Sequence, residues 1–175
     1  MSHGHGKDTS TSGGGEKMRK ISQQMVLRAT SLTKSSKETS EQYLQRVTHL
    51  HLQGKRIGKI ENLEPCTNLK VLYLYDNAIE KIEGLDNATI LQYLLLQNNK
   101  IQEVPTLAMP SLRKLYLDEN EIEELTGLEE CERLEELHLG KSPFPPPLPF
   151  FLPFFLAPCS SQPSPIFYLC LLTIH

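Results

Sequence analysis

The chain has 175 residues, and its formal net charge of −3 is divided unevenly along the sequence. Residues 1–46 contain eight Lys or Arg and four Asp or Glu, whereas residues 47–139 contain nine basic and seventeen acidic residues. The length predicts one domain with flanking segments, and the acidic region disfavours binding to nucleic acid or anionic lipid and favours a basic partner surface.

The first fifteen residues are polar and consist mainly of Gly, Ser, Thr and His. They contain too few apolar side chains to offset the entropy cost of ordering, so we predict a disordered head over residues 1–15. The same stretch lacks the apolar core of a secretory signal peptide, which predicts a cytoplasmic protein.

Residues 16–46 are predicted to form an N-terminal helical cap. Apolar residues recur there at three-to-four spacing: Met18, Ile21, Met25, Ala29 and Leu32. This spacing predicts a helix with one apolar stripe, which fits a cap on the following repeats, although its basic opposite face also fits docking to a partner or a membrane surface. The Ser- and Glu-containing stretch 35–41 predicts the start of a second short helix through Tyr43 and Leu44.

A pattern of leucine, isoleucine and asparagine repeats through residues 47–139. Its copies begin at Val47, Leu69, Leu91, Leu112 and Leu134, which gives four copies and the start of a fifth at a period of 21 or 22 residues. Such a period predicts a stacked solenoid. The L-x-L segment of each copy predicts one short parallel strand, with leucines facing inward and the residues between them lining a concave face. We therefore predict an α/β solenoid with helical or 3₁₀ turns on its convex face.

Each complete copy except the first has an asparagine after its strand, at Asn77, Asn99 and Asn120. An amide side chain can donate to and accept from backbone groups that a turn leaves unpaired, so we interpret this asparagine ladder as structural. The first copy has Lys55 at the equivalent position, which predicts a looser turn.

Two features modify the convex side. Cys66 and Cys131 occupy equivalent inward positions three copies apart, too distant for a disulfide, and are predicted to be small core residues in a reducing compartment. The third copy is one residue shorter, and Pro105 and Pro110 predict an irregular loop there.

The concave positions are informative because packing does not dictate their identity. The central row, which we call the aromatic ladder, contains His51, Tyr73, Leu95, Tyr116 and His138, and beside it stand Tyr75, Tyr93, Lys114, Asp118 and Glu136. Exposed tyrosines are common in binding hot spots, so these ten residues are the predicted partner-binding site, with cross-strand stacking that only supports the sheet as the alternative. The two ladder histidines are predicted to lie about 19 Å apart, too far to share a metal, and we expect no catalytic site and no cofactor.

From residue 140 the repeat pattern gives way to a tail rich in Pro, Phe and Leu. We interpret residues 140–175 as an aberrant tail, produced by intron read-through or an alternative end, because its composition matches pyrimidine-rich codons. A proline-rich ligand and a membrane-associated segment are the alternatives, although Pro149 and Pro153 interrupt an apolar run already too short to span a membrane.

The segments NLKVLYLYDNAIEKIEGLDNAT and LRKLYLDENEIEELTGLEE resemble the SDS22-like class of leucine-rich repeats, and in particular regulatory subunits of protein phosphatase 1. The resemblance covers about residues 20–140. It implies a noncatalytic protein-binding module, a partner such as the protein phosphatase 1 catalytic subunit, tubulin or a centrosomal protein, and a location at a microtubule-organising centre, centrosome or ciliary base. A structural scaffold without phosphatase binding is the alternative, and we expect a monomer.

Overall fold

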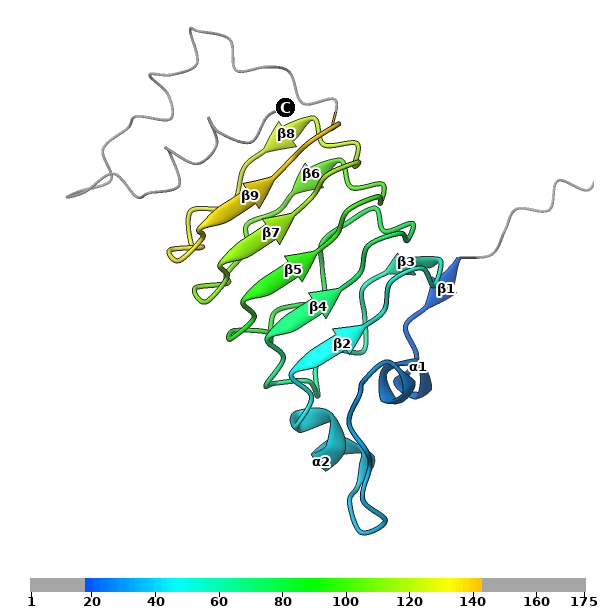
Figure 1. The fold of residues 1–175 in the computed structure, drawn as a ribbon. Helices are drawn as coiled ribbons and strands as arrows, with labels where there is room; N and C mark the ends of the chain where they lie inside the picture. Colours follow the sequence, from blue (N-terminus) through cyan, green and yellow to red (C-terminus); the bar gives the residue numbers. More distant parts are fainter. Residues whose placement is uncertain (1–17, 143–175) are drawn as a thin grey trace, which may run out of the picture.

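The computed structural model describes residues 18–142 as a stack of similar coils with two short helices at one end (Figure 1). The predicted disordered head over residues 1–15 lies outside the described range. The predicted aberrant tail over residues 140–175 also lies outside it, except for residues 140–142. Within that range, no helix has the length and apolar character needed to cross a membrane.

One strand from each copy contributes to a parallel five-stranded sheet. Its strands are β2 (His49–His51), β4 (Val71–Tyr73), β5 (Tyr93–Leu95), β7 (Lys114–Tyr116) and β9 (Glu136–His138), in that spatial order. Every pair is parallel and joins equivalent positions of successive copies. The repeat period therefore gives the predicted solenoid, and the fold class is confirmed.

The inward leucines form the continuous core. Leu72 and Leu74 are fully buried, whereas Tyr73 between them is half-buried and faces outward, as the alternation in the sequence predicts. Each such leucine contributes about 2 kcal/mol by leaving water, and one copy covers the leucines of the next. The inward leucines therefore supply most of the folding stability, and these leucines do not line the concave face.

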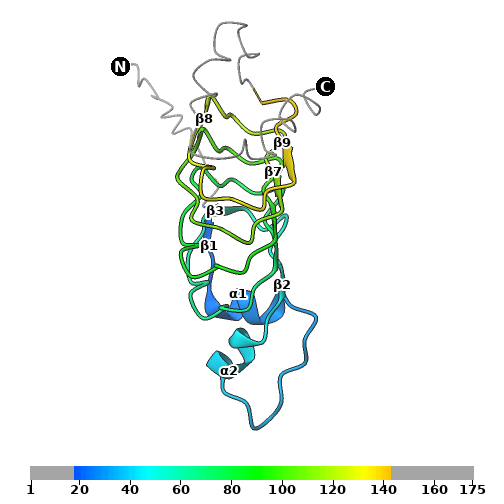
Figure 2. The same ribbon diagram turned by 90° about the vertical axis from the view of Figure 1, so that its left-hand side faces the viewer.

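A second layer faces the five-stranded sheet from the other side of the coil (Figure 2). It contains the short strands β1 (Arg19–Lys20), β3 (Ile57–Lys59), β6 (Glu103–Val104) and β8 (Glu124–Leu125). They form two parallel two-stranded sheets, β1–β3 and β6–β8. The repeat pattern in the sequence does not predict these strands.

The convex turns are short, as predicted. In the first copy the backbone N–H of Cys66 donates to the Leu63 carbonyl, and that of Leu69 donates to the Cys66 carbonyl, which gives two successive i→i+3 turns of the 3₁₀ kind. The third copy departs from this pattern, because residues 105–109 have no regular secondary structure. The prolines therefore produce the irregular loop that the sequence predicts.

The N-terminal cap differs from the single long helix predicted from the apolar stripe. Helix α1 covers only Gln23–Arg28, with the Ser22 side chain accepting from Met25 N–H at its start. Arg19–Lys20 instead forms β1, where Arg19 N–H donates 2.9 Å to the Arg56 carbonyl. Pairing with the first repeat replaces helix formation there, and Met18 and Leu32 at the two ends of the predicted stripe are 45% and 37% exposed.

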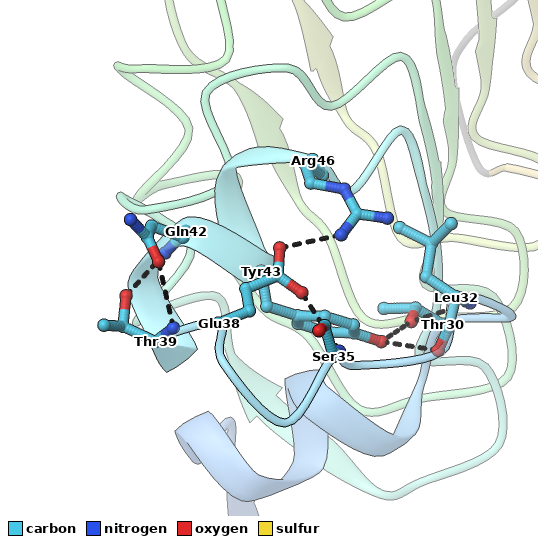
Figure 3. A network of polar contacts seen from close by, with 8 residues as sticks. All are labelled: Thr30, Leu32, Ser35, Glu38, Thr39, Gln42, Tyr43 and Arg46. Atoms are coloured by element: carbon cyan, nitrogen blue, oxygen red, sulfur yellow. Dashed lines mark hydrogen bonds and ion pairs between the residues drawn. The ribbon is translucent and has the colours of Figure 1, made fainter.

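Helix α2 (Ser40–Gln45) forms as predicted and anchors the cap through Tyr43 (Figure 3). A capping box between Thr39 and Gln42 begins the helix. The buried Tyr43 hydroxyl donates 2.9 Å to the Leu32 carbonyl and also contacts the Thr30 hydroxyl. These contacts of Tyr43 fix the loop between the two helices. A separate hydrogen bond covers the edge of β2, where His51 N–H donates to the carbonyl of Ala29 at the end of α1.

Candidate functional site

The sheet register aligns the five residues of the aromatic ladder. His51 pairs with Tyr73, Tyr73 with Leu95, Leu95 with Tyr116 and Tyr116 with His138. All five lie on the face of the sheet away from the leucine core. One continuous row of side chains is therefore available on the concave face.

The ladder consists of two stacked pairs separated by a leucine. The His51 and Tyr73 rings are stacked with centroids 4.5 Å apart and an interplanar angle of 8°. The Tyr116 and His138 rings are stacked at 4.4 Å and 20°. Leu95 stands between the pairs and is half-buried. The stacking supports the sheet, yet it leaves one face of each tyrosine turned toward the strand of Leu95.

A charged network lies at the C-terminal end of this face, centred on the Glu136 carboxylate. Lys114 Nζ lies 2.7 Å from Glu136 Oε1, and the Tyr116 hydroxyl donates 3.2 Å to Oε2. His138 Nε2 lies 3.7 Å from the same oxygen. The hydrogen bond from Lys114 lowers the pKa of Glu136, whereas desolvation and the neighbouring carboxylate raise the pKa of Tyr116. The fold thus brings four of the predicted site residues, Lys114, Tyr116, Glu136 and His138, into contact with one another, and both pKa shifts result from these contacts.

The row containing Lys114 and Glu136 connects the two ends of the face. Lys114 Nζ also lies over the Tyr93 ring, 5.9 Å from its centroid, within the range of a cation–π contact. Tyr93 pairs in turn with Val71, which is buried. Tyr93 therefore lies between the charged end of the row and the buried Val71.

The remaining predicted residues, Tyr75 and Asp118, lie on the other side of the ladder. The Asp118 carboxylate accepts a 2.8 Å hydrogen bond from Gly140 N–H. Tyr75 follows β4, in the position equivalent to Gln53 and Gln97 of the two adjacent copies. The side-chain carbonyl oxygens of these two glutamines are shielded from solvent and have no hydrogen-bond partner. This side of the ladder thus contains polar groups that the fold itself leaves incompletely paired.

The asparagine ladder lies at the ends of the strands and makes repeated contacts to the backbone. Asn99 Oδ1 accepts from Ile79 N–H at 3.0 Å, and its Nδ2 donates to the carbonyls of Leu74 and Leu96 at 3.0 and 2.9 Å. Asn120 makes the equivalent contacts one copy later. Each side chain joins its own turn to that of the preceding copy.

Asn77 additionally holds the first turn, which has no asparagine of its own. Its Oδ1 accepts from the backbone N–H groups of Lys55 and Ile57, both at 3.0 Å. The Lys55 turn, predicted to be looser, is therefore tied to the second copy by two hydrogen bonds.

The residue before each asparagine position has a left-handed backbone conformation, which was not predicted from the sequence. These residues are Gly54, Asp76, Asn98, Glu119 and Lys141, with φ between 52° and 64°. Gly, Asp and Asn adopt this conformation readily, and their presence before the asparagine was the available signal. Successive members also contact one another, since Asn98 donates 2.8 Å to the Asp76 carboxylate and Lys141 Nζ lies 2.6 Å from Glu119 Oε1.

The two cysteines within residues 18–142, Cys66 and Cys131, are free and buried, as predicted. Burial raises the pKa of each thiol to about 11. Neutral buried thiols of this kind are packing residues with little reactivity.

Solved structures with similar chains include the following two. The first is an internalin (inlF) from Listeria monocytogenes, with 32% identity over 59% of this chain and a TM-score of 0.55. This chain spans 31% of that internalin chain. The second belongs to the Drosophila melanogaster SNF/U2A' complex, with 26% identity, a TM-score of 0.53 and coverage of 71% of this chain and 70% of that one.

A family model described as leucine-rich repeat matches residues 25–142. The match includes most of helix α1, all of helix α2 and every strand of the five-stranded sheet. It agrees with the repeat period, the inward leucines and the aligned concave row, which together indicate a protein–protein interaction module. The chain belongs to the leucine-rich repeat family.

Proposed function

We propose that this chain is a noncatalytic regulatory or targeting subunit of protein phosphatase 1 that acts at the cytoskeleton. The catalytic subunit would contact the concave face, and the location would be a microtubule-organising centre, centrosome or ciliary base. The resemblance of the repeats to SDS22-like proteins, and to protein phosphatase 1 regulatory subunit 42 in particular, supports this choice of partner.

The observation that carries the binding role is the alignment of the aromatic ladder. Two stacked pairs present rigid aromatic surface on a face whose residues are not needed for the leucine core. Aromatic side chains with few rotatable bonds lose little entropy on binding, and they are frequent in hot spots. The similar chain from the SNF/U2A' complex, whose structure was solved as a complex, adds support for protein binding.

Retention of purified phosphatase catalytic subunit by the immobilised full chain tests the proposal. The chain is expected to retain the phosphatase, and the double variant Tyr73→Ala/Tyr116→Ala is expected to lose most of this binding because both tyrosines lie in the ladder. Glu132→Ala provides the control, since Glu132 is exposed on a convex turn. Its binding should equal that of the wild type.

The result separates the two functional readings. Equal retention by the double variant and the wild type would exclude the concave face as the phosphatase site. If the wild type retains tubulin or centrosomal proteins and no phosphatase, the chain is a scaffold component of the centrosome, cilium or axoneme. Thermal unfolding of each variant checks that loss of binding does not reflect loss of the fold.

A further inference from the structure

The aromatic ladder is interrupted at its centre by Leu95. Tyr73 and Tyr116 stand on the strands on either side of Leu95, in register with it. A leucine side chain is shorter than a tyrosine side chain, so the outer halves of the two rings extend beyond it. Leu95 is therefore the apolar floor of a slot between two aromatic walls, which we call the leucine slot.

The stacked partners fix the orientation of these walls. His51 covers one face of Tyr73, and His138 covers one face of Tyr116, each nearly parallel to its tyrosine. The uncovered face of each tyrosine is consequently the one directed at the leucine slot. A flat group entering the slot would meet two ring faces, rather than ring edges.

The width of the slot follows from the spacing of the strands. Two strand intervals of about 4.8 Å place the two tyrosines roughly 10 Å apart. A group midway would lie about 5 Å from each ring, within the distance of about 6 Å over which a cation is attracted to an aromatic face. A third ring in direct contact with both walls would need a separation of only about 7 to 8 Å. The spacing therefore suits a cation attracted to both rings better than a third stacked ring.

The charge of the domain favours the same occupant. Residues 47–139 contain seventeen acidic and nine basic residues, so the solenoid attracts cations. The face already contains a cation placed over a ring, since Lys114 lies 5.9 Å from the Tyr93 centroid. Cation–aromatic contact is thus a mode of interaction that this surface supports within the chain itself.

We propose that the leucine slot receives the cationic side chain of a partner protein, an arginine or a lysine, between Tyr73 and Tyr116. This inference rests on the proposed role of the concave face in protein binding and specifies the chemistry of the partner. The guanidinium or ammonium group faces both rings, and the aliphatic stem of the side chain contacts Leu95.

Titration of the full chain with two short peptides tests the slot without any phosphatase. The probes are acetyl-Gly-Arg-Gly-amide and the same peptide with citrulline, which is planar and polar but neutral. NMR signals of isotope-labelled tyrosine rings report binding, and Tyr73→Phe and Tyr116→Phe assign them. The arginine peptide is expected to shift both ring signals in a saturable way, with an affinity about fivefold higher than that of the citrulline peptide.

Two substitutions of the floor provide matched variants. Leu95→Lys places a cation of the chain in the slot and is expected to weaken arginine binding about tenfold, whereas Leu95→Met keeps an apolar floor and should bind like the wild type. Equal affinity for both peptides, shifts confined to other tyrosines, or unchanged binding by Leu95→Lys would each overturn the proposal. Such a result would leave a positive phosphatase retention standing. Arginine selectivity without phosphatase retention would overturn the phosphatase assignment alone.

Discussion

Two glycines of the solenoid allow the cost of one backbone contact to be measured by difference. Gly54 and Gly84 have nearly the same left-handed conformation, with φ of 64° and 68°. A Cβ atom at Gly54 would have no neighbour within 4 Å, whereas one at Gly84 would lie 2.6 Å from the Ile60 carbonyl oxygen. Alanine at each position therefore introduces the same backbone penalty, and only Gly84→Ala adds a clash with the preceding copy.

The left-handed conformation costs an alanine about 1 kcal/mol relative to glycine. Relief of the clash requires the Ile60 carbonyl to move away from the Gly84 turn, because the obstructing atom belongs to the backbone and has no alternative rotamer. Overpacking of this kind adds about 1 to 3 kcal/mol. We expect Gly54→Ala to lose about 1 kcal/mol of unfolding free energy and Gly84→Ala to lose about 2 to 4 kcal/mol.

Urea unfolding of the full chain, followed by circular dichroism, measures both losses against the wild type. A domain of this size has an unfolding free energy of about 5 to 15 kcal/mol, so both variants should remain folded without denaturant. The decisive quantity is the difference between the two variants. Losses equal to within about 0.5 kcal/mol would refute the reasoning, because they would mean that successive copies separate freely at this turn.

Three further predictions concern the asparagine ladder, the charged end of the concave face and the buried thiols. Asn99→Asp replaces the amide group that donates to two backbone carbonyls by a carboxylate oxygen, which cannot donate. It should lower the unfolding free energy, measured in urea, by about 3 to 5 kcal/mol. The control Asn87→Asp, at an exposed position, should lower it by no more than about 0.5 kcal/mol. The hydrogen bond from Lys114 lowers the pKa of Glu136, so in Lys114→Met this pKa, measured by carbon NMR, should rise toward the usual carboxyl value. The small stability that the Lys114–Glu136 contact contributes is present at pH values above the usual carboxyl pKa and is lost as pH falls through the lowered pKa. An unchanged pKa of Glu136 in the variant would contradict the contact. Burial raises the pKa values of the Cys66 and Cys131 thiols to about 11, so both should resist alkylation near pH 8 in the native chain and react after unfolding in urea. Peptide mass spectrometry detects the alkylated residues. Alkylation of either cysteine before unfolding would show that reagent reaches the core.

The fold was predictable because the repeat encodes a single physical requirement at every period. Alternation such as that of Leu72, Tyr73 and Leu74 predicts both the strand and its buried side, and the period of 21 or 22 residues aligns equivalent positions. The register of the aromatic ladder follows from these two patterns alone. The contacts that the concave residues make with one another were not predictable in the same way, since ring stacking and the shared Glu136 carboxylate depend on side-chain rotamers.

The errors lie where local preference competed with pairing between distant segments. Of the predicted apolar stripe, Ile21 and Ala29 are buried, but the fully buried Val26 was not part of it. At the start of the stripe, β1 pairs with the first repeat in place of extending the helix. In a helix, the backbone N–H of Arg19 would form one local hydrogen bond. In β1 it instead donates to the Arg56 carbonyl, and β1 also covers the edge of β3 in the first copy. This pairing depends on a segment almost forty residues away, so a local periodicity cannot reveal it.

The shortened third copy shows why the concave row stays aligned while the convex side varies. The step from Tyr93 to Lys114 is 21 residues, one fewer than the other steps, yet the two residues pair in the same register as their equivalents. The missing residue is absorbed by the irregular loop between Pro105 and Pro110, which is outside the ladder of strands. The inward leucines and the asparagine hydrogen bonds on either side of the loop fix the strands independently of its length. Tyr116 therefore remains opposite Leu95, so that a change in the convex loop alters the outer surface without opening or closing the slot between the tyrosines.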